Sequence, residues 1–217
     1  MLLATPRFAL ILALCIGPFA VSAVERYPAT TDDGLARVEH RRIDALYERP
    51  GAALAQYRRV AVQDCSVSFR KNWLRDQNRD RPLTLRVDQR DMDRIGTRLA
   101  TACRDIFSKA LADAGLEVVT DASADVLVLQ PAIVDLDLYA PDVDSPGLVR
   151  IWSESAGEMT LNLDLRAGDA TVARIIDHQH ARRDTSIQQR SRASNDFDLQ
   201  AVLRQWARLV RTELAGY

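Results

Sequence analysis

Apolar side chains recur every third or fourth position between residues 88 and 115, which is the spacing of one face of an α-helix. This stripe consists of Met92, Ile95, Leu99, Cys103, Ile106, Ala110 and Ala114. Asp88 precedes it as a favourable N-cap, and Gly115 follows it and readily adopts the left-handed backbone that ends helices. A second stripe predicts another helix from about residue 196 onward. Its members are Leu199, Val202, Leu203, Trp206, Leu209, Val210 and Leu214.

Other segments alternate between apolar and polar residues, or are apolar throughout, as is typical of β-strands. Residues 57–69 carry apolar side chains on both faces and predict an interior strand. Residues 126–139 begin as a continuous apolar run and then alternate, with Pro131 expected to mark a bulge or a break. Residues 158–166 and 171–180 alternate on either side of a glycine turn, which predicts a hairpin.

The order of these elements predicts the α/β class, of the α+β type. We expect a two-layer sandwich, in which a mixed sheet of four to five strands is covered on one face by the two helices. The chain divides into a single domain at residues 57–217 and an irregular amino-terminal arm at residues 24–56, where apolar residues are sparse. The uncovered face of the sheet is then available to a ligand or a partner.

The first 23 residues have the pattern of a secretory signal peptide, with an apolar run at residues 8–20 and small residues at 21–23. We therefore expect an exported protein, periplasmic or associated with the outer envelope. Cys15 is a poor lipid-attachment site because a leucine precedes it and the apolar run continues beyond it. Membrane anchoring through Cys15 is not expected.

Export leaves two cysteines, Cys65 and Cys103, in an oxidising compartment that favours a disulfide between them. Cys103 belongs to the apolar stripe of the first helix and should face the sheet. Cys65 shares its side of the predicted strand with Tyr57, Ala61, Val67 and Phe69. The alternative is two separate thiols that act as core residues.

The overall composition restricts the function. The 217 residues include 29 Lys and Arg against 30 Asp and Glu, and this near-zero net charge argues against nucleic acid as a partner. The mature chain has no G-x-x-x-x-G-K, G-x-G-x-x-G or G-x-S-x-G motif, so no cofactor and no catalytic residue is predicted.

Two groups of potential metal ligands stand out, and neither predicts a metal site. His178 and His180 lie on the same side of a strand, but a metal needs a third ligand, and Asp177 points to the opposite side. The acidic residues around Pro141 lack the glycine turn and the glutamate of a calcium loop. They are Asp135, Asp137, Asp142 and Asp144.

The arginine-rich segment at residues 70–94 is the best candidate for a binding surface. Guanidinium groups suit phosphates and carboxylates, and aromatic residues suit partner contacts. The candidate partner-binding residues are Trp73, Arg70, Arg75, Arg79 and Arg81. The alternative is a solvated loop, because Asp76 and Asp80 partly neutralise the arginines.

Several short segments between residues 32 and 183 carry a resemblance to a known family. They are Asp33-Gly34-Leu35, residues 47–51, residues 57–62, Trp73, and a strand pair around Gly168 that ends near Asp177. They resemble the secreted proteobacterial proteins called domain of unknown function 3313, many of which are regarded as lipoproteins. The resemblance implies an envelope location and brings no established activity. The predicted layout is also similar to the amino-terminal domain of TolB and to the curli-secretion lipoprotein.

These observations favour a non-enzymatic, exported envelope protein that acts by binding. Its partner would be an envelope protein, a lipid headgroup or a cell-wall component. The sequence does not define the oligomeric state of the protein itself. Two alternatives stay open: a small-ligand-binding periplasmic module that uses the open sheet face, and a cryptic hydrolase. An enclosed apolar pocket would favour the first, and a histidine held by Asp beside Ser or Cys would favour the second.

Overall fold

The computed structural model describes residues 26–138, 151–153, 157–181, 188–190 and 192–215. The strands of its main sheet are β1 (Ala36–Val38), β2 (Ala45–Glu48), β3 (Arg59–Val62), β4 (Ser66–Phe69), β5 (Glu117–Val118), β6 (Val126–Leu138), β8 (Gly157–Ala167) and β9 (Ala170–Ala181). The helices are α1 (Trp73–Gln77), α2 (Gln89–Ala112) and α3 (Arg192–Ala215), with single 3₁₀ turns at Leu54–Gln56 and Leu83–Leu85. A separate pair is formed by β7 (Ile151–Ser153) and β10 (Gln188–Arg190).

The main sheet is mixed, and its strand order is β1-β2-β9-β8-β6-β3-β5. β3 and β4 both pair in parallel with β6, one after the other along the same edge, and β5 pairs in parallel with β3. The remaining pairs are antiparallel. The prediction of four to five strands was too low, since this sheet has eight in the described part of the chain. Residues 57–69 form two strands instead of one, and the predicted arm contributes two more.

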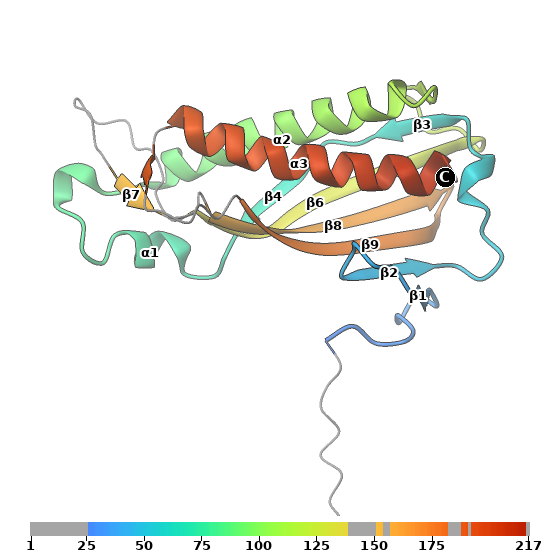
Figure 1. Cartoon of the computed structure of the whole chain (residues 1–217), viewed down its shortest axis with the longest axis horizontal. Coiled ribbons are helices and arrows are strands. Elements are labelled where there is room, and N and C mark those ends of the chain that lie inside the picture. Colours follow the sequence, from blue (N-terminus) through green and yellow to red (C-terminus); the bar gives the residue numbers. More distant parts are fainter. Residues whose placement is uncertain (1–25, 139–150, 154–156, 182–187, 191, 216–217) are drawn as a thin grey trace, which may run out of the picture.

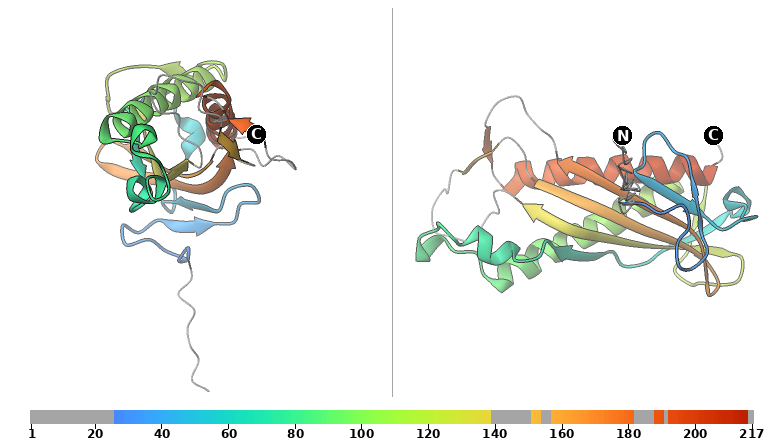
Figure 2. Two further views of the ribbon diagram at one scale, coloured as in Figure 1. Left: turned by 90° about the vertical axis from the view of Figure 1, so that its left-hand side faces the viewer. Right: turned by 90° about the horizontal axis from the view of Figure 1, so that it is seen from below.

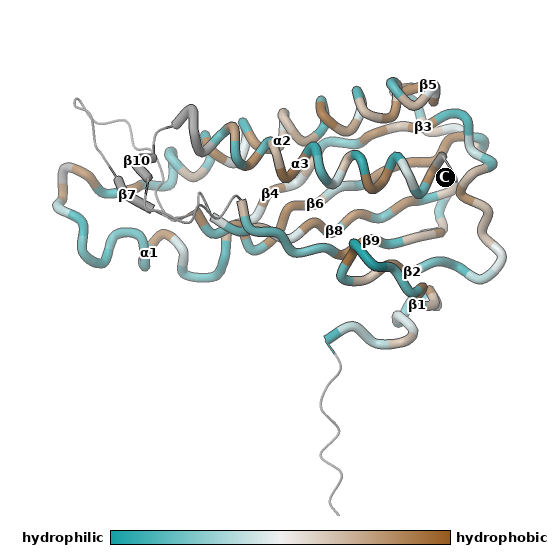
Figure 3. Tube along the Cα trace, in the orientation of Figure 1, coloured by the Kyte–Doolittle hydropathy of each residue, from teal (hydrophilic) through white to brown (hydrophobic). Residues whose placement is uncertain are grey.

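The two long helices lie side by side on one face of the sheet, while the opposite face is left open over much of its length (Figures 1 and 2). The main core fills the space between the two layers. Figure 3 shows where apolar residues recur along the two long helices and the central strands. The hairpin of β8 and β9 was predicted correctly. In β8 the residues Met159, Leu161, Leu163 and Leu165 are buried against the helices, as the alternation indicated.

The ends of α2 were also predicted correctly. The carboxylate of Asp88 accepts a hydrogen bond from the backbone N–H of Asp91, and the side chain of Asp91 accepts one from the N–H of Asp88. Gly115 has a φ of 82°, the left-handed conformation expected after a helix. The buried line is slightly rotated from the predicted stripe: Phe107 and Leu111 are in the core, and Ile106 packs at its margin.

The prediction of an irregular arm at residues 24–56 was wrong, because this segment contains β1 and β2 at the edge of the sheet. Tyr47 of β2 is buried, and its hydroxyl donates a hydrogen bond to the carbonyl of Pro28. Leu35 and Ala45 complete a small apolar cluster there. Strands of three and four residues are too short to show a recognisable alternation, so the pattern concealed them.

Bulges shift the side-chain alternation in two strands, β6 and β9. Pro131 pairs regularly with Leu163, so the break predicted there is absent. The irregularity in β6 lies instead at Asp135, whose φ of 52° is tolerated by aspartate better than by most residues. Beyond it Leu136 joins the core, while Asp137 points to the open face beside Glu158.

The predicted signal peptide and Cys15 lie outside the described residues, and they stay predictions. Within the part that the structure describes, no helix has the length and apolar character needed to cross a bilayer.

Candidate functional site

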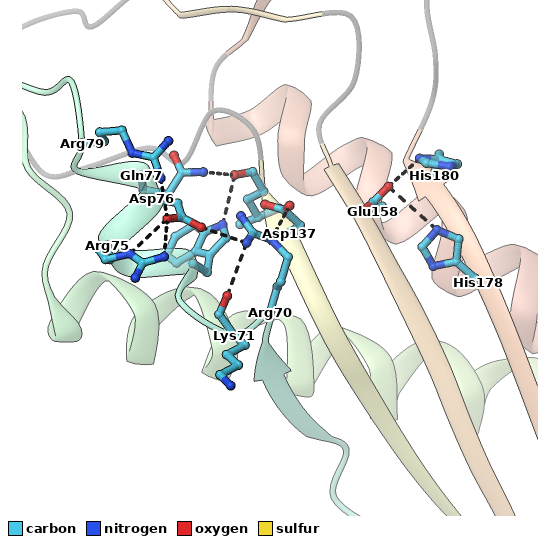
Figure 4. A network of polar contacts seen from close by, with 12 residues as sticks. Arg70, Lys71, Arg75, Asp76, Gln77, Arg79, Asp137, Glu158, His178 and His180 are labelled. Carbon is cyan, nitrogen blue, oxygen red and sulfur yellow. Dashed lines mark hydrogen bonds and ion pairs between the residues drawn. The ribbon is translucent and has the colours of Figure 1, made fainter. Parts of the chain in front are cut away.

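A network of arginines and carboxylates connects α1 with the end of β6 (Figure 4). Arg70 follows β4, and its Nε donates to Oδ2 of Asp137 across 2.7 Å. Its Nη1 donates to Oδ2 of Asp76 at 3.0 Å. Arg70 therefore sits between two carboxylates, one on the sheet and one on α1. These hydrogen bonds raise the pKa of the Arg70 guanidinium, so it stays charged.

Asp76 is the centre of this network. Its other carboxylate oxygen, Oδ1, accepts from Nη2 of Arg75 at 3.2 Å and from Nη2 of Arg79 at 3.1 Å. The hydrogen bond from Arg70 is the main cause that lowers the pKa of Asp76 below its usual 3.8. The three arginines are thus arranged around one ionised carboxylate. Sequence reasoning treated Asp76 only as a neutralising charge and missed this organising role.

Trp73 does not lie on the surface as predicted, because only 1% of it is exposed. Its ring packs against Phe69 with 4.5 Å between ring centres, and its indole N–H donates to the carbonyl of Leu138. The side-chain amide of Gln77 donates to the same carbonyl at 2.7 Å. Trp73 therefore anchors α1 to the end of β6, and it is not an exposed partner contact.

Arg81 is also placed differently from the other arginines. Its guanidinium donates to the side chain of Gln77 and to the carbonyl of Leu85, and burial lowers its pKa. Of the four predicted partner-binding arginines, Arg75 and Arg79 are the most exposed, and 69% of each side chain is exposed. Leu83, in the following 3₁₀ turn, is 80% exposed, although an isolated leucine in a polar segment gave no clear signal. We call Arg75, Arg79 and Leu83 the α1 surface.

The two cysteines are brought together as predicted. Cys65 and Cys103 are placed at bonding distance, with their Cα atoms 6.2 Å apart, and both are buried. The face assigned to Cys65 needs one correction. Cys65 lies in the main core with Val60, while Ala61 belongs to a cluster on the opposite side. The chain between β3 and β4 interrupts the alternation, so Cys65 faces the helices.

The two strand histidines acquire a carboxylate neighbour that the sequence analysis missed. Glu158 of β8 lies directly opposite His180 of β9, with Oε2 of Glu158 3.1 Å from Nδ1 of His180. The same oxygen is 3.8 Å from Nε2 of His178. Figure 4 shows the three side chains converging. Asp177 lies on the other side of β9, where its buried carboxylate accepts from the indole of Trp206.

The two described aspartates that were considered as calcium ligands, Asp135 and Asp137, do not form a common site. Asp137 is engaged by Arg70, and Asp135 is exposed at the bulge. Asp142 and Asp144 lie outside the part of the chain that the structure describes.

The described residues define a helix-covered mixed sheet with an arginine surface at one end. The chain belongs to the family described as "Protein of unknown function (DUF3313)", whose model matches residues 26–210. The predicted family is therefore confirmed. No match was found among the curated proteins.

Several solved structures are similar to this chain at low sequence identity. A PelC dodecamer from Paraburkholderia phytofirmans is 14% identical, with a TM-score of 0.41 over 78% of this chain and 97% of that one. A protein of the DUF330 family from Xanthomonas campestris is 15% identical, with a TM-score of 0.42 over 78% and 90% of the two chains. A minor lipoprotein from Acinetobacter baumannii is 7% identical, with a TM-score of 0.35 over 74% and 94%.

Proposed function

We propose that this protein is an exported, non-enzymatic protein of the cell envelope that binds an acidic protein partner through its α1 surface. The observation that carries the proposal is the arrangement of Arg75 and Arg79 around Asp76. The signal-peptide pattern of residues 1–23 supports the compartment.

The two exposed guanidiniums keep donors available to a partner. Each guanidinium has five N–H groups. Contacts with described residues use Nε and Nη2 of Arg75 and Nη2 of Arg79. The remaining N–H groups match the bidentate geometry of a carboxylate. Binding of an acidic side chain there would extend the existing network instead of building a new one.

Asp76 also reduces the cost of binding. It holds Arg75 and Arg79 in place before a partner arrives, and less side-chain entropy is then lost on association. Asp76 is itself held by Arg70, and the N–H of Asp76 donates to the carbonyl of Asn72. Residues 70–81 contain five Lys and Arg residues against Asp76 and Asp80, and with Asp137 of β6 included a local excess of positive charge remains. This charge selects an acidic partner and speeds its encounter.

Leu83 favours a protein over a lipid surface as the partner. An exposed leucine on the same segment as two arginines resembles the combination found in protein interfaces, where apolar anchors are surrounded by charged residues. A membrane-binding surface would need several exposed apolar residues, and in this segment Trp73 is buried.

The open sheet face does not favour the small-ligand alternative, and the histidines do not favour the hydrolase. The hollow on the open sheet face is lined by polar groups such as Gln63, Gln130 and Asn162, in contrast to an enclosed apolar ligand pocket. The histidine side chains contact Glu213, Thr160 and Glu158, and in the described part of the chain no histidine contact with a Ser or Cys side chain is found. The arrangement that was expected of a hydrolase, a histidine held by Asp beside Ser or Cys, is therefore not formed by these residues.

The proposal is tested by replacing Arg75 and Arg79 with serine and comparing proteins recovered by quantitative cross-linking in the native envelope. The matched control replaces Arg41 and Arg58, which are exposed arginines on other parts of the chain, and it changes the net charge equally. We expect a partner that the wild type and the control recover equally and that the R75S/R79S variant recovers at least about tenfold less, the effect of about 1.4 kcal/mol. Equal recovery by all three proteins would contradict the proposal.

A further inference from the structure

We infer that Glu158, His178 and His180 form a binding site for a divalent transition-metal ion, of which Zn²⁺ is the representative. The inference is independent of the α1 surface. It rests on three side chains from two adjacent strands, whose candidate ligand atoms all lie within 4.8 Å of one another.

The distances match those between ligands of one metal ion. Donor atoms at about 2.0–2.1 Å from a tetrahedral zinc ion are about 3.3 Å from each other. Oε2 of Glu158 is 3.1 Å from Nδ1 of His180 and 3.8 Å from Nε2 of His178. An ion between these atoms would require only small side-chain rotations. Two imidazoles and one carboxylate are a common donor set for zinc and for neighbouring first-row metals.

The environment of Nδ1 of His180 is a second, independent indication of a metal site. Its Nδ1 is enclosed by the protein and has no hydrogen-bond partner among the described residues, since its contact with Glu158 lacks hydrogen-bond geometry. A buried nitrogen without a hydrogen bond is unfavourable, and such atoms call for an explanation. A metal ion shared with Glu158 would satisfy it.

Thr160 orients His178 as a second metal ligand. Its Oγ1 lies 3.1 Å from Nδ1 of His178. If Nδ1 carries the proton and donates it to Thr160, the lone pair of Nε2 faces Glu158. Ligating histidines usually donate their second N–H in this way, which fixes the ring and its tautomer.

The β8 strand that carries Glu158 is paired on both of its edges. β8 lies between β6 and β9 in the sheet, and Glu158 and Thr160 stand directly opposite His180 and His178. On the other face, Met159 and Leu161 are fully buried in the core. Sites built on strands hold their geometry better than sites on loops. Three protein ligands leave a further position for water or for a donor atom from another molecule.

The test uses the mature protein without a histidine tag, stripped with a chelator and then dialysed against Zn²⁺. We expect about one bound ion per chain by elemental analysis. The E158Q and H180Q variants should bind at least about 100-fold more weakly, and the T160V variant about 10- to 100-fold more weakly. Absorption spectra of the Co²⁺-loaded protein then distinguish four-coordinate from six-coordinate binding.

The H40Q variant is the matched control. Nε2 of His40 lies 3.1 Å from Oε1 of Glu213, so this pair has the same distance but lacks a second imidazole. Its replacement should leave Zn²⁺ binding unchanged. Circular dichroism confirms that each variant is folded. The inference is overturned if the wild type takes up no Zn²⁺, if E158Q and H180Q bind it as tightly as the wild type, or if H40Q loses it.

Discussion

Nε of Arg70 donates to Oδ2 of Asp137 across 2.7 Å, and this contact joins the segment that carries α1 to the end of β6. The carboxylate of Asp137 is only 14% exposed, so it depends on this partner more than a surface carboxylate would. The position of Asp137 results from the bulge at Asp135, which turns its side chain to the open face. One local irregularity of the backbone thus places the carboxylate that binds Arg70.

Replacement of Arg70 by methionine should destabilise the fold by about 1 kcal/mol, because Asp137 then loses a charged donor while Arg70 is partly exposed. Amide exchange of residues 73–77 should increase more than that of β8. Urea unfolding of R70M, D137N and the double variant gives the coupling between the two residues. Additive effects of the two substitutions would show that the contact contributes nothing.

Acid should weaken the fold partly through Asp76. Its pKa is lower in the folded protein than the usual 3.8, chiefly because of the hydrogen bond from Arg70. The stabilising contribution is therefore complete above pH 3.8 and is lost as the pH falls through the folded pKa. The urea midpoint of the wild type should decline more steeply below this pH than that of D76N. Identical slopes for the two proteins would refute this role, and D80N serves as the control.

We predict that Cys65 and Cys103 are bonded in the exported protein. The loop between them spans 38 residues, and closing it should stabilise the fold by about 4 kcal/mol in the chain-entropy model. Thiol counting in denaturant without reductant should find none in the mature chain, and the C65S/C103S variant should melt at a lower temperature. Two free thiols per chain would exclude the bond.

The long, regular elements could be predicted from the sequence, because their patterns extend over many residues. The helix α2, with Asp88 and Gly115 at its ends, and the hairpin of β8 and β9 are examples. β1 and β2 escaped detection since each has four residues or fewer. In the longer strands, single-residue shifts in the alternation concealed which face some side chains occupy.

The cluster around Glu158 shows the effect of such a shift most clearly. Counted back from the turn, where Ala167 pairs with Ala170, regular pairing would place Glu158 opposite Gln179. The histidines would then point to the other face. A shift between Leu165 and Arg166 moves the register by one residue and places Glu158 opposite His180. Nothing in the local sequence identifies that shift, so the carboxylate could not be assigned beforehand.

The amino terminus offers a further prediction. Signal peptidase should cleave after Ala23, so the mature protein should start at Val24 without lipid. Intact-mass measurement of the exported protein checks both statements. A mass that corresponds to an acylated Cys15 would place the protein on a membrane and would reverse this assignment.

The most direct test of the proposed function is site-specific photo-cross-linking in intact cells. A photoreactive amino acid is introduced in place of Leu83 on the α1 surface or, as a control, in place of Val118, an exposed residue in β5. The proposal predicts one acidic protein cross-linked from position 83, absent from position 118, and lost when Arg75 and Arg79 are also replaced by serine. Cross-links that are the same from both positions, or that persist in the R75S/R79S background, would contradict it.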